Sequence, residues 1–136
     1  MDHATLIKRY VGVEAARMVD MDSVVGMGTG STAVFVIEEL GRRVREEGLQ
    51  IIGVATSYDS DVLARQCGIA IRTLDDVNRV DIAIDGADEV DSQKRLIKGG
   101  GAAHTREKII DGMAERFVVV VDDSKVVDRL GTKFPV

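Results

Sequence analysis

Hydrophobic and polar positions follow two alternating patterns along this chain of 136 residues. Short runs rich in Val and Ile are separated by longer stretches whose apolar residues recur at helical spacing. This alternation predicts an α/β fold with a mostly parallel open sheet flanked by helices. The predicted strands are Val24–Gly26, Leu49–Ala55, Ile69–Arg72, Val80–Ile84 and Phe117–Val121.

Four helices are predicted before and between these strands. Two of them end next to a glycine, Gly48 or Gly68, because glycine tolerates the left-handed conformation just past a helix end. The helices are Thr5–Val19, Ser31 or Thr32 to Gly48, Asp59–Cys67 and Thr105–Glu115.

The first and the last helix are each expected to bury one apolar face. In the first helix the spacing predicts a face made of Leu6, Ile7, Tyr10, Val11, Ala15, Met18 and Val19. In the last helix it predicts that Ile109, Ile110 and Met113 are buried.

Composition indicates one α/β domain over residues 1–136, with 45% hydrophobic and 30% charged residues. The net charge of -5 argues against a nucleic-acid surface. The basic cluster Arg42, Arg43 and Arg45 is better explained as complementing the dipole at a helix end.

The remaining composition points to the cell compartment. The single cysteine, Cys67, cannot form an internal disulfide and is expected in the core rather than as a nucleophile. The apolar stretches are too short for a membrane span or a secretory signal. We therefore expect a cytoplasmic protein without a membrane or nucleic-acid partner. Because the chain stops one residue after its only proline, Pro135, we also expect a truncated C-terminal end.

A glycine-rich loop follows the first strand and opens the second helix. It contains Gly26, Gly28, Gly30 and then Ser31 and Thr32. Such a loop can bring backbone amides and a helix N-terminus to a phosphate. Ser31 replaces the third glycine of the dinucleotide fingerprint, and Gly30 replaces the lysine of a triphosphate loop, so a monophosphate fits better. In the simpler alternative, the glycines only permit a tight turn and Ser31 or Thr32 caps the helix.

Acidic residues follow the fourth predicted strand. Asp85 and Asp88 are placed to contact one ligand or to act as a proton donor and acceptor, although Asp is also common in turns. A metal held by Asp85, Asp88, Glu89 and Asp91 is a weaker alternative. The two histidines, His3 and His104, lack ligand spacing, so we expect no metal.

A lysine before three glycines and a glutamate shortly after them complete the set of candidates. Lys98 would stabilise negative charge that develops on a sugar oxygen. Glu107, in the first turn of the last helix, is a candidate base that abstracts a carbon-bound proton. Taken alone, Glu107 is better explained by the helix dipole, and it becomes a candidate base only beside Lys98 and Asp85.

Four motifs together resemble the ribose-5-phosphate isomerase family of the A type. They are GMGTGSTA at Gly26–Ala33, AIDGADEVD at Ala83–Asp91, LIKGGGAAHTREKI at Leu96–Ile109 and DDSK at Asp122–Lys125. The resemblance implies a Rossmann-like fold and interconversion of ribose 5-phosphate and ribulose 5-phosphate in the pentose phosphate pathway, without metal or organic cofactor.

The resemblance also implies roles for individual residues. The catalytic set is Glu107 as base, with Lys98, Asp85 and Asp88. The substrate-binding set is Gly28, Thr29, Gly30, Ser31, Thr32, Gly86, Ala87, Gly99, Gly100, Gly101 and Lys125, with Lys8 as a weaker assignment. Members of the family continue into a smaller α/β subdomain that this chain lacks, and that subdomain helps to build a homo-oligomer.

Two other functions remain as alternatives. A non-catalytic sugar-phosphate-binding domain of the same fold would keep the glycine loop and need neither Glu107 nor Lys98. A nicotinamide oxidoreductase is disfavoured because Ser31 interrupts the fingerprint and no acid follows Val54 at the end of the next strand.

Overall fold

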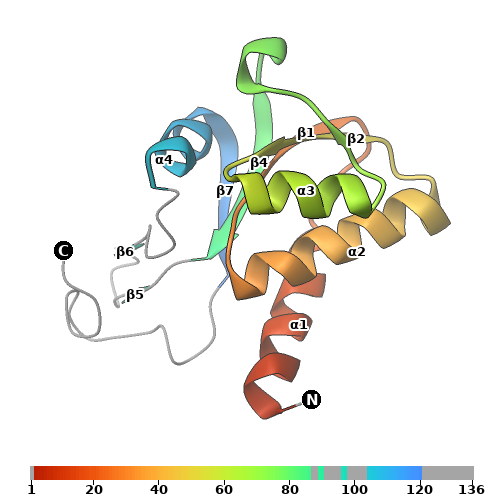
Figure 1. Ribbon diagram of the computed structural model, residues 1–136, viewed down its shortest axis with the longest axis vertical. Helices are drawn as coiled ribbons and strands as arrows, with labels where there is room; N and C mark the ends of the chain where they lie inside the picture. Colours follow the sequence, from red (N-terminus) through yellow and green to blue (C-terminus); the bar gives the residue numbers. More distant parts are fainter. Residues whose placement is uncertain (1, 87–88, 91–95, 98–103, 121–136) are drawn as a thin grey trace.

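Five parallel strands form the central sheet of the protein, with helices on both faces (Figure 1). The structure, a computed structural model, describes residues 2–86, 89–90, 96–97 and 104–120. The strand order is β3-β2-β1-β4-β7, and each neighbouring pair runs parallel. The strands are β1 (Ser23–Met27), β2 (Ile51–Ala55), β3 (Ala70–Ile71), β4 (Val80–Gly86) and β7 (Ala114–Val120). The predicted fold class and all five predicted strands are confirmed, with small shifts at their ends.

Four α-helices connect or precede the strands, as predicted. They are α1 (His3–Ala16), α2 (Ser31–Glu47), α3 (Tyr58–Gln66) and α4 (His104–Met113). Gly48 has φ 71° and Gly68 has φ 87°, so both helix-ending glycines adopt the left-handed conformation expected of them. The structure adds a 3₁₀ helix, η1 (Leu74–Asp76), and a short antiparallel pair, β5 (Glu89–Val90) with β6 (Leu96–Ile97). No helix in the described part of the chain is long and apolar enough to cross a membrane.

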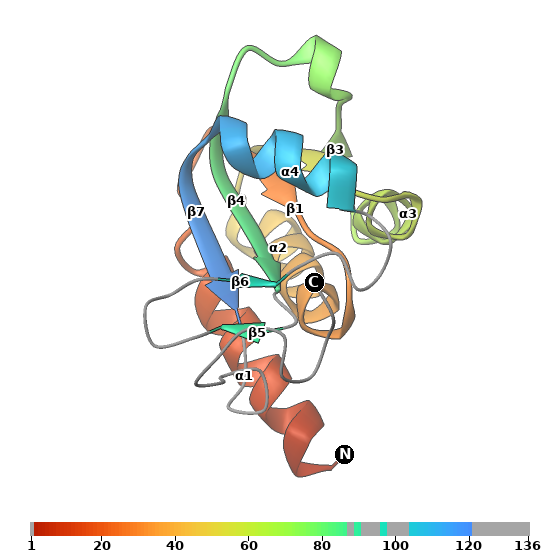
Figure 2. The same cartoon turned by 90° about the vertical axis from the view of Figure 1, so that its left-hand side faces the viewer.

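The two faces of the sheet are covered unequally. Because side chains alternate along a strand, Val25 and Met27 face α1, α2 and α3, whereas Val24 faces α4. The face with three helices holds the larger apolar cluster, and the α4 face holds a smaller cluster around Ile110. Figures 1 and 2 show this arrangement, with α4 as the one described α-helix on its side of the sheet.

The predicted apolar face of α1 is only partly buried. Ala15 and Val19 belong to the core, but Leu6, Tyr10 and Met18 are 51%, 69% and 39% exposed. The prediction was wrong for Leu6 and Tyr10 because the N-terminal half of α1 projects beyond α2 and the sheet (Figure 1), and for Met18 because α1 already ends at Ala16. Only the second half packs, and there Gly12 lets α1 approach the backbone of α2 closely.

The prediction for α4 was also only partly right. Ile110 is 1% exposed, but Ile109 and Met113 are 50% and 42% exposed. Ile110 packs closely against β1 because Gly26 has no side chain. A Cβ at Gly26 would lie only 2.6 Å from Ile110 Cγ2. The missing side chain of Gly26 thus provides the space in which Ile110 holds α4 on the sheet, while the other apolar residues face outward.

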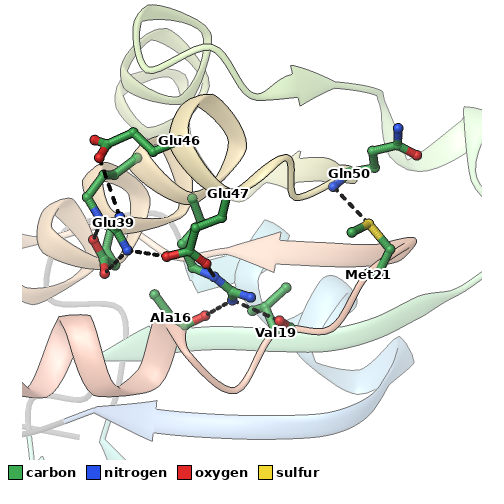
Figure 3. Close-up of polar contacts among 9 residues, drawn as sticks. Ala16, Val19, Met21, Glu39, Glu46, Glu47 and Gln50 are labelled. Carbon is green, nitrogen blue, oxygen red and sulfur yellow. Dashed lines mark hydrogen bonds and ion pairs between the residues drawn. The ribbon is translucent and has the colours of Figure 1, made fainter.

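The basic cluster at the end of α2 caps neighbouring helices. Arg43 Nη1 donates to the carbonyl oxygens of Ala16, the last residue of α1, and of Val19 in the turn beyond it, both at 2.8 Å (Figure 3). Arg45 Nη1 donates to Cys67 O at the end of α3 at 2.7 Å. Arg42 instead pairs with acids of α2 itself. These cations therefore satisfy the last carbonyl groups of other helices, as well as complementing the dipole of their own.

Candidate functional site

The strand order places a topological switch point between β1 and β4. From β1 the chain continues through α2 to β2 on one side, whereas β4 leads on towards α4 and β7 on the other. In open parallel sheets, ligands bind in the crevice outside the carboxyl ends of the strands at such a point. The glycine-rich loop after β1 and Asp85 near the end of β4 lie at this edge, so the structure brings these two predicted motifs together.

Gly28 and Asp85 are in direct contact. Gly28 N donates to Ile84 O at 2.9 Å, which ties the loop to the end of β4. A Cβ on Gly28 would overlap Oδ1 and Cγ of Asp85 and lie 2.8 Å from its Cβ. Asp85 is only 2% exposed, and its Oδ1 accepts a hydrogen bond from Gly86 N at 2.8 Å. Glycine is therefore required at position 28 to make room for a buried carboxyl group.

The N-terminus of α2 has no side-chain cap. Its N-cap residue is Gly30, with φ 102° and ψ 178°, a conformation that favours glycine. The simpler alternative, in which Ser31 or Thr32 caps the helix, does not hold, because both residues lie inside its first turn. By contrast, Asp2 caps α1 and Ser57 caps α3. Of the three α-helices whose N-cap is described, α2 alone leaves its first amides uncapped by a side chain, which suits an anionic ligand.

A residue outside the predicted set supports the loop from the next strand. Ser57, which follows β2, donates from Oγ to Thr29 Oγ1 at 3.1 Å. The residue before it, Thr56, continues the hydrogen bonding between β1 and β2 past the end of β2, since Thr56 N donates to Met27 O at 3.0 Å. Neither Thr56 nor Ser57 was among the predicted site residues. The signal was their position, because β2 is the direct neighbour of β1.

A pocket of about 230 Å³ lies on the α2 and α3 side of the loop. Four residues of the predicted binding set line it, together with Asp59, Ser60 and Leu63 of α3; these four are Gly28, Thr29, Gly30 and Ser31. Lys8, which is half-buried in α1, does not line this pocket.

The predicted base belongs to the helix on the other face. Since β7 begins directly after Met113, α4 ends at the amino edge of the sheet. Glu107 precedes Ile110 by three residues, so its backbone lies one further turn from that edge. The side chain of Glu107 lies outside the described part. The same holds for whole residues of the predicted site, namely Lys98, Asp88, Ala87, Gly99, Gly100, Gly101 and Lys125.

Acidic clusters and the single cysteine bear on metal binding and on nucleophilic chemistry. Among the residues that the structure describes, no cluster of three or more His, Cys, Asp or Glu side chains could hold a metal ion. Cys67 packs against the larger apolar cluster, and burial raises the pKa of its thiol. Because the thiolate is the reactive form, a raised pKa agrees with a structural cysteine.

Comparison with known proteins identifies the family. Residues 52–136 match the family model of ribose 5-phosphate isomerase A (phosphoriboisomerase A). The chain belongs to this family. A similar relative is ribose-5-phosphate isomerase A of Trichormus variabilis, which is 56% identical over 136 residues, covering 99% of this chain and 58% of the relative.

Solved structures of the family share the fold. Ribose 5-phosphate isomerase A from Methanocaldococcus jannaschii matches with a TM-score of 0.92 and 52% identity, over 95% of this chain and 57% of that one. A D-ribose-5-phosphate isomerase in complex with phospho-erythronic acid matches with a TM-score of 0.94 and 44% identity, over 98% of this chain and 58% of that one. This chain thus spans somewhat more than half the length of these family members.

Proposed function

We propose that this chain carries the reaction centre of an aldose-ketose isomerase that interconverts ribose 5-phosphate and ribulose 5-phosphate. The observation that carries the proposal is the contact between Gly28 and Asp85 at the switch point of a sheet whose family acts as this isomerase. At the carboxyl edge of the sheet, the buried carboxyl group of Asp85 offers a group for proton transfer, and the uncapped N-terminus of α2 offers an anion site.

The proposed chemistry assigns one task to each group. Glu107 takes the proton from carbon 2 of the open-chain sugar and returns it to carbon 1 through an enediolate. Lys98 stabilises the negative oxygen of that intermediate, and Asp85 and Asp88 move hydroxyl protons during ring opening. No metal or organic cofactor takes part.

Binding of the phosphate fixes the reacting carbons. The phosphate lies at Thr29, Gly30, Ser31 and Thr32, and the sugar contacts Gly86 and Ala87. The other proposed substrate-binding residues are Gly28, Gly99, Gly100, Gly101, Lys125 and Lys8. A sugar-phosphate ligand agrees with the phospho-erythronic acid bound to the related isomerase.

The wider setting follows from this assignment. A cytoplasmic enzyme of the pentose phosphate pathway is proposed, and it forms a homo-oligomer when the family's full length is present. A non-catalytic sugar-phosphate-binding domain is not favoured, because the relatives at 52–56% identity are named as isomerases.

The test is Glu107→Gln, which keeps the size of the side chain and removes the base. Ketose formation from ribose 5-phosphate should fall by about 100-fold to 10,000-fold. Calorimetry should show nearly unchanged ribose 5-phosphate binding. The measurement is made on this chain and on a version extended over the family's remaining length, which also shows whether the shorter chain is active. Unchanged turnover of Glu107→Gln in an active version would exclude Glu107 as the base.

A further inference from the structure

The hydroxyl group of Ser57 makes hydrogen bonds both to the N-terminus of α3 and to the glycine-rich loop. Its Oγ accepts a hydrogen bond from Ser60 N at 3.2 Å, which is the helix cap. The same Oγ donates to Thr29 Oγ1 at 3.1 Å, which is a contact across 28 positions of sequence. One side chain therefore serves two elements, and only the first of these roles belongs to helix capping.

The hydroxyl contacts of Ser57 show which atom donates to Thr29. Ser60 Oγ lies 3.1 Å from Ser57 O, which can only accept, so Ser60 supplies the proton of that bond. Ser60 Oγ in turn accepts from Ser57 N at 3.2 Å. Ser57 Oγ also lies 3.1 Å from Ser60 Oγ, a contact in which either atom could donate. Because Ser60 uses its proton on Ser57 O, the proton of Ser57 is directed to Ser60 Oγ or to Thr29 Oγ1, and in the contact with Thr29 it is Ser57 that donates.

This assignment determines what Thr29 can do. Once its oxygen accepts from Ser57, its own proton is available to another acceptor, and none of the described residues accepts it. Thr29 is half-buried and stands next to Gly30, where the uncapped N-terminus of α2 begins. A hydroxyl with its proton free, next to unbonded amides, is suited to a phosphate oxygen.

We propose that Ser57 is a positioning residue of the sugar-phosphate site, which fixes the Thr29 hydroxyl so that Thr29 donates its proton to the phosphate. The inference rests on the proposed function for the identity of the ligand. Ser57 itself does not touch the substrate. Its effect passes through Thr29 and is a matter of binding rather than of proton transfer at carbon.

The central experiment compares Ser57→Ala with two matched variants. Ser57→Ala should raise the KM for ribose 5-phosphate about tenfold, since a hydrogen bond to a charged group loses its fixed direction, and kcat should change by less than about twofold. Ser57→Thr retains a hydroxyl and should restore KM. Ser60→Ala disturbs the same capping box but leaves the Ser57 to Thr29 bond, so it should lower the melting temperature and leave KM unchanged.

A double-mutant cycle tests whether Ser57 acts through Thr29. Thr29→Val alone should raise KM, and adding Ser57→Ala should raise it no further. Ser57→Gly removes the hydroxyl with little loss of capping and replaces Ser57→Ala if that variant does not fold. Equal KM changes in Ser57→Ala and Ser60→Ala, or additive effects with Thr29→Val, overturn the proposal.

Titration with inorganic phosphate, followed by amide shifts of Thr29 and Gly30, separates this inference from the isomerase assignment. If phosphate binding depends on Ser57 in a protein that forms no ketose, the positioning role holds and the proposed reaction fails. If ketose forms and Ser57→Ala leaves KM and phosphate binding unchanged, the reaction holds and the positioning role fails. If the protein neither binds phosphate at these amides nor forms ketose, both are wrong.

Discussion

The two edges of the sheet use similar residues for different purposes. At the amino edge, a pocket of about 320 Å³ is lined by four acids, two arginines and four other residues. There Asp81 Oδ2 accepts from Val24 N at 2.7 Å, and Arg79 Nε donates to Asp81 Oδ1 at 2.9 Å. At the carboxyl edge, the 2% exposed Asp85 lies against the backbone of Gly28.

This difference shows which features mark a site. The carboxylate of Asp81 ties the start of β4 to the start of β1, and its arginine partner is largely exposed, so the ion pair itself contributes little. The carboxyl edge combines a glycine opposite the buried Asp85, a second glycine, Gly30, with a positive φ of 102°, and a helix without a side-chain cap. These features cost stability, and a turn with a purely structural role does not require them. A pocket with many charges is thus a weaker indicator of function than a buried acid for which the backbone has made room.

The largest expected effect comes from Gly28→Ala, which removes that room. The new methyl group would overlap the carboxyl group of Asp85, so we expect a loss of about 1–3 kcal/mol in the free energy of unfolding. Ketose formation should fall by about 100-fold, because displacing a reacting group by about 1 Å has that effect. Urea unfolding and a ribose 5-phosphate assay measure both quantities.

The matched control is Gly112→Ala in α4, where an added Cβ meets nothing within 4 Å. This substitution should stabilise the protein by about 0.4–1 kcal/mol, because alanine loses less backbone freedom in a helix than glycine. A Gly28→Ala protein as stable and active as the unmodified one would show that Asp85 moves aside freely, and the contrast between the edges would disappear.

A similar loss of stability but a much smaller effect on activity is expected at the amino edge from Asp81→Ala. Val24 N would lose its acceptor inside the sheet, which should lower the free energy of unfolding by about 1–3 kcal/mol. Asp81→Asn keeps an oxygen for this bond and should recover most of the loss. Under conditions in which the protein is folded, KM and kcat for ribose 5-phosphate should stay within about twofold of the original values, the size of change that corresponds to about 0.4 kcal/mol. A selective rise in KM would place this pocket in the reaction.

The fold could be predicted from sequence because its signals are local. Val- and Ile-rich runs mark the strands. Gly48 and Gly68 mark helix ends because the positive φ found at these positions favours glycine. The predicted burial of Leu6, Tyr10, Ile109 and Met113 failed because helical spacing identifies an apolar face without showing how far a neighbour extends over it.

The site could be predicted only in part. Asp85 and the glycine loop follow strands whose carboxyl ends share one edge, so their proximity followed from a parallel sheet. The contribution of Ser57 did not follow, because it depends on β2 lying beside β1 and on one hydroxyl reaching Thr29 across 28 positions. The placement of Lys98 and Glu107 over the same sugar stays a prediction.

The smallest effect is expected from Thr56→Val at the carboxyl edge. It removes a buried hydroxyl group without a hydrogen-bond partner among the described residues, in contrast to the hydrogen-bonded Asp81 of the amino edge. Thr56 is 2% exposed, and its Oγ1 has no hydrogen-bond partner among the described residues. Replacing the hydroxyl by a methyl group should raise the free energy of unfolding by up to about 1 kcal/mol, because a buried polar atom without a partner is costly. KM should change little, since the enclosed oxygen does not reach the solvent from which a sugar binds.

Thr73→Val is the matched control for this change. Its hydroxyl donates to Asp76 Oδ2 at 3.2 Å at the surface, so the same substitution should leave stability unchanged or lower it slightly. A clear loss of stability in Thr56→Val would mean that its oxygen has a partner beyond the described residues. A rise in KM without such a loss would instead place Thr56 beside Ser57 at the sugar-binding edge. Two hydroxyl residues outside the predicted set, Ser57 and Thr56, would then distinguish the carboxyl edge from the amino edge.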